Sequence, residues 1–197
     1  MQYSTTLLFY DSRSGIAEFY GVDDYGNLNQ LSSTTYSTGW THIIPIPVLG
    51  GPGTTLLFYN SNSGPAQFYS TDGQGGINQL TSTTYSTGWT HIIPGDFAAD
   101  FSPRALLFYN GNSGLGQFYN TDFKGGMHQL SSATYSTGWT HIVDVPADQG
   151  PDLVDDDLLF YNGNSGVAQF YRSDRQGHIN QLSSTTYSTG WTLIEWL

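Results

Sequence analysis

The sequence predicts an all-β fold, a four-bladed β-propeller with one four-stranded antiparallel blade per repeat of about 50 residues. The segment TYSTGWTHI occupies residues 35–43, 84–92 and 134–142, and it returns at 186–194 with Leu193 in place of histidine. The segment LLFY begins at Leu7, Leu56, Leu106 and Leu158. In every copy the first leucine precedes the threonine of TGW by 31 positions, so the repeated part aligns without a gap. No stretch combines helical periodicity with helix caps.

Four strand patterns follow one another inside each repeat. In the second repeat they are TLLFYN, AQFYS, INQLTST and WTHII, separated by turn residues such as Asn60, Gly64 and Asp72. We therefore predict a single domain with blades at residues 2–45, 52–94, 102–144 and 154–197. Variation in length is confined to linkers between the repeats, where insertions are tolerated. Residues 195–197 are expected to close the ring against residues 2–6.

The charge balance excludes several partners. The chain carries 5 basic and 16 acidic residues, a net charge of −11, so a nucleic-acid partner is not expected. No apolar run reaches the length of a membrane helix, so membrane insertion is not expected either.

Cysteine is absent, which excludes disulfides and thiolate chemistry. No signal peptide is visible, and the localisation stays open between the cytoplasm and a secreted mature form.

Two segments resemble the FG-GAP/VCBS-type repeat of β-propellers. One is IPGDFAADFSPRALLFYN, with a Gly-Asp-Phe segment and an acidic loop before an apolar strand. The other is LFY-(N/D)-x-x-SG-x-x-(E/Q)-FY, followed by a glycine turn and GW-x-x-I(I/V)P. The resemblance covers the whole chain and implies a propeller for adhesion and recognition, in some relatives with calcium in the acidic loop.

Calcium would have its candidate ligands here in Asp144, Asp148 and Asp152 of the third linker. A solvated acidic loop is the preferred interpretation of these aspartates. No cofactor is therefore expected.

The sequence does not predict an enzyme. Gly-x-Ser-x-Gly is absent, and no pair of carboxylates recurs in the repeats. Glu18 is replaced by glutamine in the other three copies. The aspartate of the glycine turn, Asp72 in the second repeat, is explained by the turn itself.

We predict instead a multivalent, lectin-like carbohydrate-binding protein, because sugars bind on aromatic faces with a fan of polar groups. The expected ligand contacts are Tyr36, Tyr85, Tyr135, Tyr187, Trp40, Trp89, Trp139, Trp191, Asp11, Asn60, Asn110, Asn162, Gln30, Gln79, Gln129 and Gln181. Three alternatives stay open. The tryptophans could pack as wedges between blades, and the glutamines could form a polar ladder paired to neighbouring strands. Recent duplication could account for the identity of the repeats. The partners would be glycans or glycoconjugates bound by a monomer. The alternative function is a structural or protein-interaction propeller.

Overall fold

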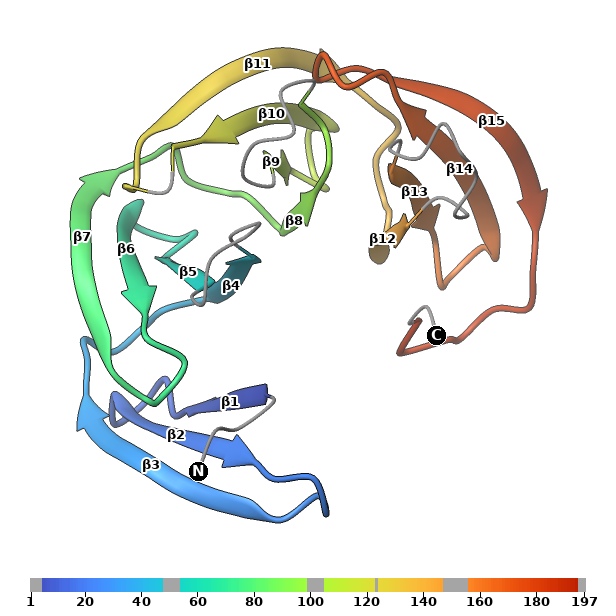
Figure 1. The fold of residues 1–197 in the computed structure, drawn as a ribbon. Coiled ribbons are helices and arrows are strands. Elements are labelled where there is room, and N and C mark those ends of the chain that lie inside the picture. The colour runs from blue at the N-terminus through green and yellow to red at the C-terminus, as the bar shows by residue number, and fades with distance from the viewer. Residues whose placement is uncertain (1–4, 48–53, 99–104, 123, 147–155, 195–197) are drawn as a thin grey trace, which may run out of the picture. The chain divides into compact units, whose positions relative to one another are not determined.

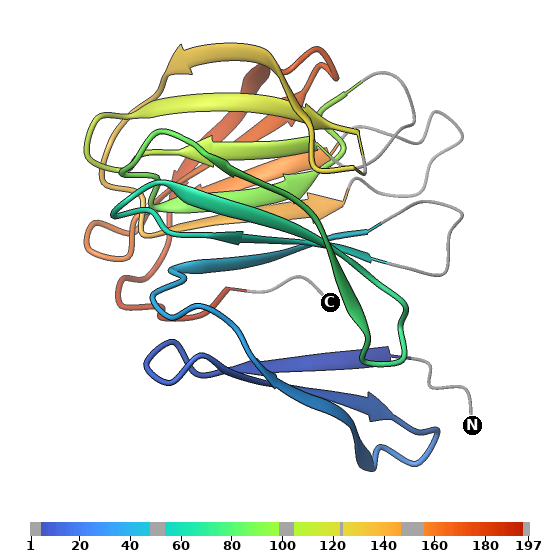
Figure 2. The same cartoon turned by 90° about the vertical axis from the view of Figure 1, so that its left-hand side faces the viewer.

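The structure is a computed structural model that describes residues 5–47, 54–98, 105–122, 124–146 and 156–194. Within these residues the secondary structure is entirely β, in four antiparallel sheets (Figures 1 and 2). This confirms the predicted all-β, four-bladed propeller class. The chain divides into two compact units, residues 1–87 with 123–126 and residues 88–122 with 127–197. Each unit is described by itself.

The first unit holds two sheets. The first sheet has the order β1 (Thr5–Tyr10), β2 (Ile16–Val22), β3 (Leu28–Thr35). The second has the order β4 (His42–Pro47), β5 (Thr54–Tyr59), β6 (Pro65–Thr71), β7 (Ile77–Thr84). Among the described strands β1 pairs with β2 alone, so the first sheet has one strand fewer than the second.

The second unit also holds two sheets, each with four strands. The third sheet has the order β8 (His91–Gly95), β9 (Ala105–Tyr109), β10 (Leu115–Thr121), β11 (Met127–Thr134). The fourth has the order β12 (His141–Pro146), β13 (Asp156–Tyr161), β14 (Val167–Ser173), β15 (Ile179–Thr186). Within the described residues no helix is long and apolar enough to cross a membrane.

The WTHI strand belongs to a different sheet from the one expected. Sequence reasoning placed it last in its own repeat, but β4 pairs with β5, the LLFY strand of the following repeat. His42 lies opposite Tyr59 and Ile43 lies opposite Phe58. A short connection favours an antiparallel hairpin between consecutive strands, and the apolar residues of β4 then face the core. Each sheet is therefore shifted by one strand relative to the repeat.

Hydrogen bonds in the turn after LLFY explain why Asn and Gly recur there. Asn60 Oδ1 accepts from the backbone N–H groups of Asn62 and Ser63, and Asn60 Nδ2 donates to the carbonyl oxygen of Gly39 at 2.8 Å. Gly64 has a φ of 94°, which only glycine adopts without strain. The asparagine thus holds its own turn and also the turn that precedes β4.

A second repeated hydrogen bond links LLFY to TYSTGW. The hydroxyl of Tyr59 donates to the carbonyl oxygen of Ser86 at 2.5 Å, and Tyr109 donates to Ser136 at 2.5 Å. Tyr10 makes the equivalent bond to Ser37 at 2.6 Å. These bonds tie the two repeated segments of one repeat together. They give a structural reason for the recurrence of both segments.

Aromatic rings form the core of each unit. In the first unit Phe58 is fully buried, and the rings of Tyr36, Trp40 and Tyr69 lie at centroid distances of 5.6, 5.9 and 5.1 Å from it. The second unit repeats the tryptophan contact. There Trp139 lies 5.8 Å from Phe160 in an edge-to-face arrangement. Edge-to-face aromatic pairs add stability beyond the area that they bury.

Candidate functional site

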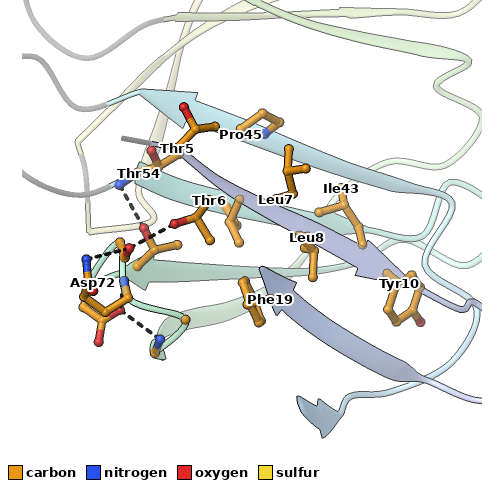
Figure 3. Close-up of a pocket in the computed structure, with 16 residues that line it drawn as sticks. Thr5, Thr6, Leu7, Leu8, Tyr10, Phe19, Ile43, Pro45, Thr54 and Asp72 are labelled. Atoms are coloured by element: carbon orange, nitrogen blue, oxygen red, sulfur yellow. Dashed lines mark hydrogen bonds between the residues drawn. The ribbon is translucent and has the colours of Figure 1, made fainter. Parts of the chain in front are cut away.

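A cavity of about 750 Å³ lies between the first and second sheets, inside the first unit. It is lined by β1, β4, β5, Phe19 of β2 and the turn from Asp72 to Gly76. Its size is that of a small-molecule site. Figure 3 shows Thr6, Thr54 and Asp72 toward one end of the cavity and Leu8, Ile43 and Tyr10 toward the other. The cavity thus offers one polar end and one apolar end.

The Asp72 turn forms the polar end. Asp72 Oδ1 accepts from the backbone N–H of Gln74 at 2.7 Å and from that of Gly76 at 2.8 Å. Thr6 Oγ1 donates to the carbonyl oxygen of Gly73 at 2.9 Å, which joins β1 to the turn. The Asp72 carboxylate is therefore fixed through Oδ1. The backbone of its loop is held by Thr6 of the first sheet.

The residue four positions after the aspartate of this turn differs between the repeats. In the first repeat Asn27 donates to Asp23, and these hydrogen bonds lower the pKa of that carboxyl below its usual value. In the fourth repeat His178 Nδ1 lies 3.1 Å from Asp174 Oδ2. The second repeat has Gly76 at this place, as the third has Gly126, and a Cβ on Gly76 would collide with Asp72 Oδ2. Asp72 Oδ2 thus lies where the first and fourth repeats supply a side-chain partner.

In the second unit the equivalent position between sheets is filled by the chain itself. Phe97 is fully buried, and its ring lies 5.1 Å from that of Phe118, the counterpart of Phe19. The carbonyl oxygen of Phe97 accepts from the backbone N–H of Gly177, the counterpart of Gly75, at 3.1 Å. The space between the third and fourth sheets therefore accommodates an aromatic ring and a carbonyl oxygen. Among the residues described in the first unit, none takes the place of Phe97.

The structure places the predicted aromatic contacts largely in the core. Trp40, Trp89 and Trp139 are buried, and Tyr36, Tyr85 and Tyr135 are half-buried. Burial raises the pKa of both Tyr36 and Tyr135 to about 12. In the fourth repeat Tyr187 and Trp191 are exposed. Their assignment as ligand contacts stays a prediction.

The predicted polar contacts lie in turns and on outer strands. Asn110 and Asn162 hold their turns as Asn60 does, and Asp11 accepts from Arg13 N and from Ser14 in the same position. The four glutamines lie exposed on the third strand of each repeat; they are Gln30, Gln79, Gln129 and Gln181. None of these sixteen predicted residues lines the cavity.

The calcium candidates are only partly described. Asp144 lies in β12 opposite Leu158, whereas Asp148 and Asp152 lie outside the described residues. Of the ends expected to close the ring, residues 2–4 and 195–197 also lie outside the described residues. No group of three or more metal-ligating side chains occurs within the described part of the chain. Calcium binding and the expected absence of a cofactor both stay predictions.

Sequence reasoning missed the cavity because it treated Asp72 as a turn residue alone. The available signal was a difference between copies: Asn27 and His178 stand four positions after the aspartate in the first and fourth repeats, whereas Gly76 and Gly126 stand there in the second and third. A glycine at that position leaves one carboxylate oxygen unoccupied by the turn. Position 76 was read as part of a glycine turn, so the difference was overlooked.

Comparisons with known proteins support the fold. No family model matches the chain, and no curated protein matches it. Among solved structures, a periplasmic gluconolactonase of Pseudomonas aeruginosa aligns with a TM-score of 0.61 at 15% identity, over 94% of this chain and 52% of that one. A candidate 6-phosphogluconolactonase of Bacteroides fragilis gives 0.59 at 11% identity, over 93% and 54%. A protein of Lactobacillus plantarum gives 0.53 at 14% identity, over 94% and 69%.

The fold is that of a β-propeller. The chain spans about half the length of the two lactonase structures. The prediction of a lectin-like protein that is not an enzyme, with glycans as partners, is contradicted, because the named neighbours are lactonases and therefore hydrolytic enzymes. The alternative of a purely structural or protein-interaction propeller is contradicted by the same finding.

Proposed function

We propose that the chain binds and hydrolyses small sugar lactones in the cavity of the first unit. The observation that carries the proposal is the equivalence of this cavity to the place of Phe97 in the second unit. In the second unit the backbone N–H of Gly177 donates to the carbonyl oxygen of Phe97. The lactonase names of the structural neighbours support the same chemical class. The finer assignment to FG-GAP/VCBS-type repeats also stays a proposal.

Gly75 would bind the substrate carbonyl as Gly177 binds that of Phe97. A lactone presents one carbonyl oxygen on a compact ring, so the ring would lie against Phe19 while the oxygen accepts from the Gly75 N–H. The same N–H would stabilise the negative charge that develops on this oxygen in the transition state.

Asp72 would act as the general base. Its Oδ2 takes a proton from a water molecule while the water oxygen bonds to the carbonyl carbon. The ring C–O bond then breaks, and the ring oxygen receives the proton as it leaves as a hydroxyl group. The product is the open-chain hydroxy acid. Asp72 Oδ1 stays fixed by the N–H groups of Gln74 and Gly76 during this step.

The lining of the cavity favours an uncharged lactone. It includes Asp72 and four threonines but no lysine or arginine. A phosphorylated lactone would bring a second negative charge toward the carboxylate without a compensating cation. Gluconolactone is therefore expected to be a better substrate than its 6-phosphate.

Asp72→Asn is expected to lower the rate of gluconolactone hydrolysis by about 10²-fold or more, because an amide cannot accept the proton. The rate is measured by acid release in a pH-stat and corrected for spontaneous hydrolysis. Asp23→Asn is the matched control, since Asp23 holds the same turn in the first repeat and does not line the cavity.

Thermal unfolding of both variants shows whether the turn survives either change. A wild-type rate equal to spontaneous hydrolysis would refute the proposal. Equal losses in the two variants would show that the aspartate supports the turn only.

A further inference from the structure

Two hydroxyl groups of the first sheet contact the turn that contains Asp72 (Figure 3 shows the first). Thr6 Oγ1 of β1 donates to the carbonyl oxygen of Gly73 at 2.9 Å. Ser32 Oγ of β3 donates to the carbonyl oxygen of Gly75 at 2.5 Å. Both bonds lie inside the first unit and join its two sheets. The turn of the second sheet is therefore held by side chains of the first sheet.

Each hydroxyl binds a peptide group that itself donates to Asp72. The carbonyl of Gly73 and the N–H of Gln74 belong to one planar peptide group, and this N–H donates to Asp72 Oδ1 at 2.7 Å. The carbonyl of Gly75 and the N–H of Gly76 also share a peptide group, and this N–H donates to the same oxygen at 2.8 Å. Two hydrogen-bond relays thus run from the first sheet through the backbone to one carboxylate oxygen.

The relay that starts at Thr6 affects the carboxylate in two ways. A peptide group whose oxygen accepts a hydrogen bond becomes a stronger donor through its N–H, because the first bond polarises the amide. The Thr6 hydroxyl therefore strengthens the bond from Gln74 to Asp72, and it also restricts the turn. With Oδ1 held by two N–H groups, the carboxylate has one preferred orientation and Oδ2 keeps a fixed direction.

The second unit has one of the two relays. Ser131 Oγ donates to the carbonyl oxygen of Gly177, and the N–H of His178 in the same peptide group donates to the aspartate of that turn at 3.0 Å. The counterpart of Thr6 in that unit is Ala105, which has no hydroxyl. The serine relay is thus common to both units, whereas the threonine relay occurs in the unit that contains the cavity.

We propose that Thr6 is a positioning residue that acts through Asp72, by way of the peptide group between Gly73 and Gln74. The role rests on the proposed function, in which Asp72 takes the proton from water. The hydroxyl proton of Thr6 is engaged by the Gly73 carbonyl oxygen. Thr6 therefore contributes to the rate by holding the base in its reactive orientation.

Amide protons test the threonine relay without any lactone. In proton–nitrogen NMR spectra of the whole chain, Thr6→Val is expected to move the Gln74 amide proton upfield and to increase its hydrogen-exchange rate several-fold, while the Gly76 amide stays unchanged. Valine keeps the β-branched shape that suits strand β1. Ser32→Ala is expected to give the opposite pattern, and Thr6→Ser is expected to preserve both amides. A Gln74 amide that does not respond to Thr6→Val would overturn the proposal.

The kinetics of gluconolactone hydrolysis test the consequence for the reaction. Thr6→Val is expected to lower kcat about 10-fold and to change KM less than about twofold, because the base is misplaced while the lactone keeps its contacts. Thr6→Ser is expected to retain kcat. In an Asp72→Asn background Thr6→Val is expected to have no further effect, since no base is left to position. An equal loss in both backgrounds would overturn the proposal in favour of a direct contact between Thr6 and the lactone.

Ser131→Ala is the matched control, because it removes the equivalent serine bond in the second unit and is expected to leave the rate unchanged. The two measurements separate this proposal from the proposed function. A wild type that does not accelerate hydrolysis would refute the lactonase and the catalytic role of Thr6 together, while the Gln74 amide still decides whether Thr6 holds Asp72. Wild-type hydrolysis that Thr6→Val leaves unaltered would refute the positioning role alone.

Discussion

Phe58→Ala is expected to lower the free energy of unfolding by about 3–5 kcal/mol, the usual loss for a buried phenylalanine. Phe58 is fully buried and contacts the rings of Tyr36, Trp40 and Tyr69. Its removal leaves a cavity that these large rings cannot fill without leaving their preferred rotamers. Urea unfolding followed by tryptophan fluorescence measures the change.

Phe9→Ala is the matched control, since Phe9 occupies the same place in the first repeat but is half-exposed. Its effect is expected to be less than half that of Phe58→Ala. Equal effects of the two substitutions would contradict the burial described above.

Raising the pH from about 10 to 12 is expected to destabilise the fold. Burial raises the pKa of four tyrosines to about 12, from an ordinary value of 10; they are Tyr36, Tyr59, Tyr109 and Tyr135. Between these values the unfolded chain loses protons that the folded chain retains, so unfolding becomes more favourable as the pH rises. Below pH 10 the stabilisation is fully present.

Each of these tyrosines is expected to account for about 1 kcal/mol after allowance for solvent screening. The measurement is urea unfolding at pH 9, 10, 11 and 12, with phenolate absorbance recorded in parallel. Tyr59→Phe is expected to reduce the alkaline loss, because the ring stays and the ionisable hydroxyl goes. A free energy of unfolding that is constant from pH 9 to 12 would refute the assignment.

The strands could be predicted from the sequence because the pattern repeats four times. Alternating residues and turn glycines located the three strands that start at Thr54, Pro65 and Ile77, within a few residues of their observed positions. The partner of the WTHI strand could not be predicted in this way. A strand between two LLFY segments has the same alternation whichever neighbour it joins, and only the packing of Trp40 on Phe58 decides.

The candidate site was less accessible to sequence reasoning. Residues that recur in every copy attracted attention, yet Asn60 and Tyr59 recur because they hold turns. The cavity instead arises where the copies differ: Gly76 stands where the first and fourth repeats have a side-chain partner of the aspartate, and no described residue of the first unit occupies the place that Phe97 fills in the second. The effect of such a difference can be recognised only when the packing of the sheets is known.

The shift of each sheet by one strand also bears on how the chain avoids misfolding. Nearly identical WTHI segments can pair with any LLFY segment, so sequence complementarity alone does not select the partner. Strand β4 ends at Pro47 and β5 begins at Thr54. So short a tether gives the neighbouring strand an effective concentration in the millimolar range, far above that of a strand from another chain. Selection among equivalent partners is thus made by chain proximity, and lengthening this tether would favour strand exchange between molecules and aggregation.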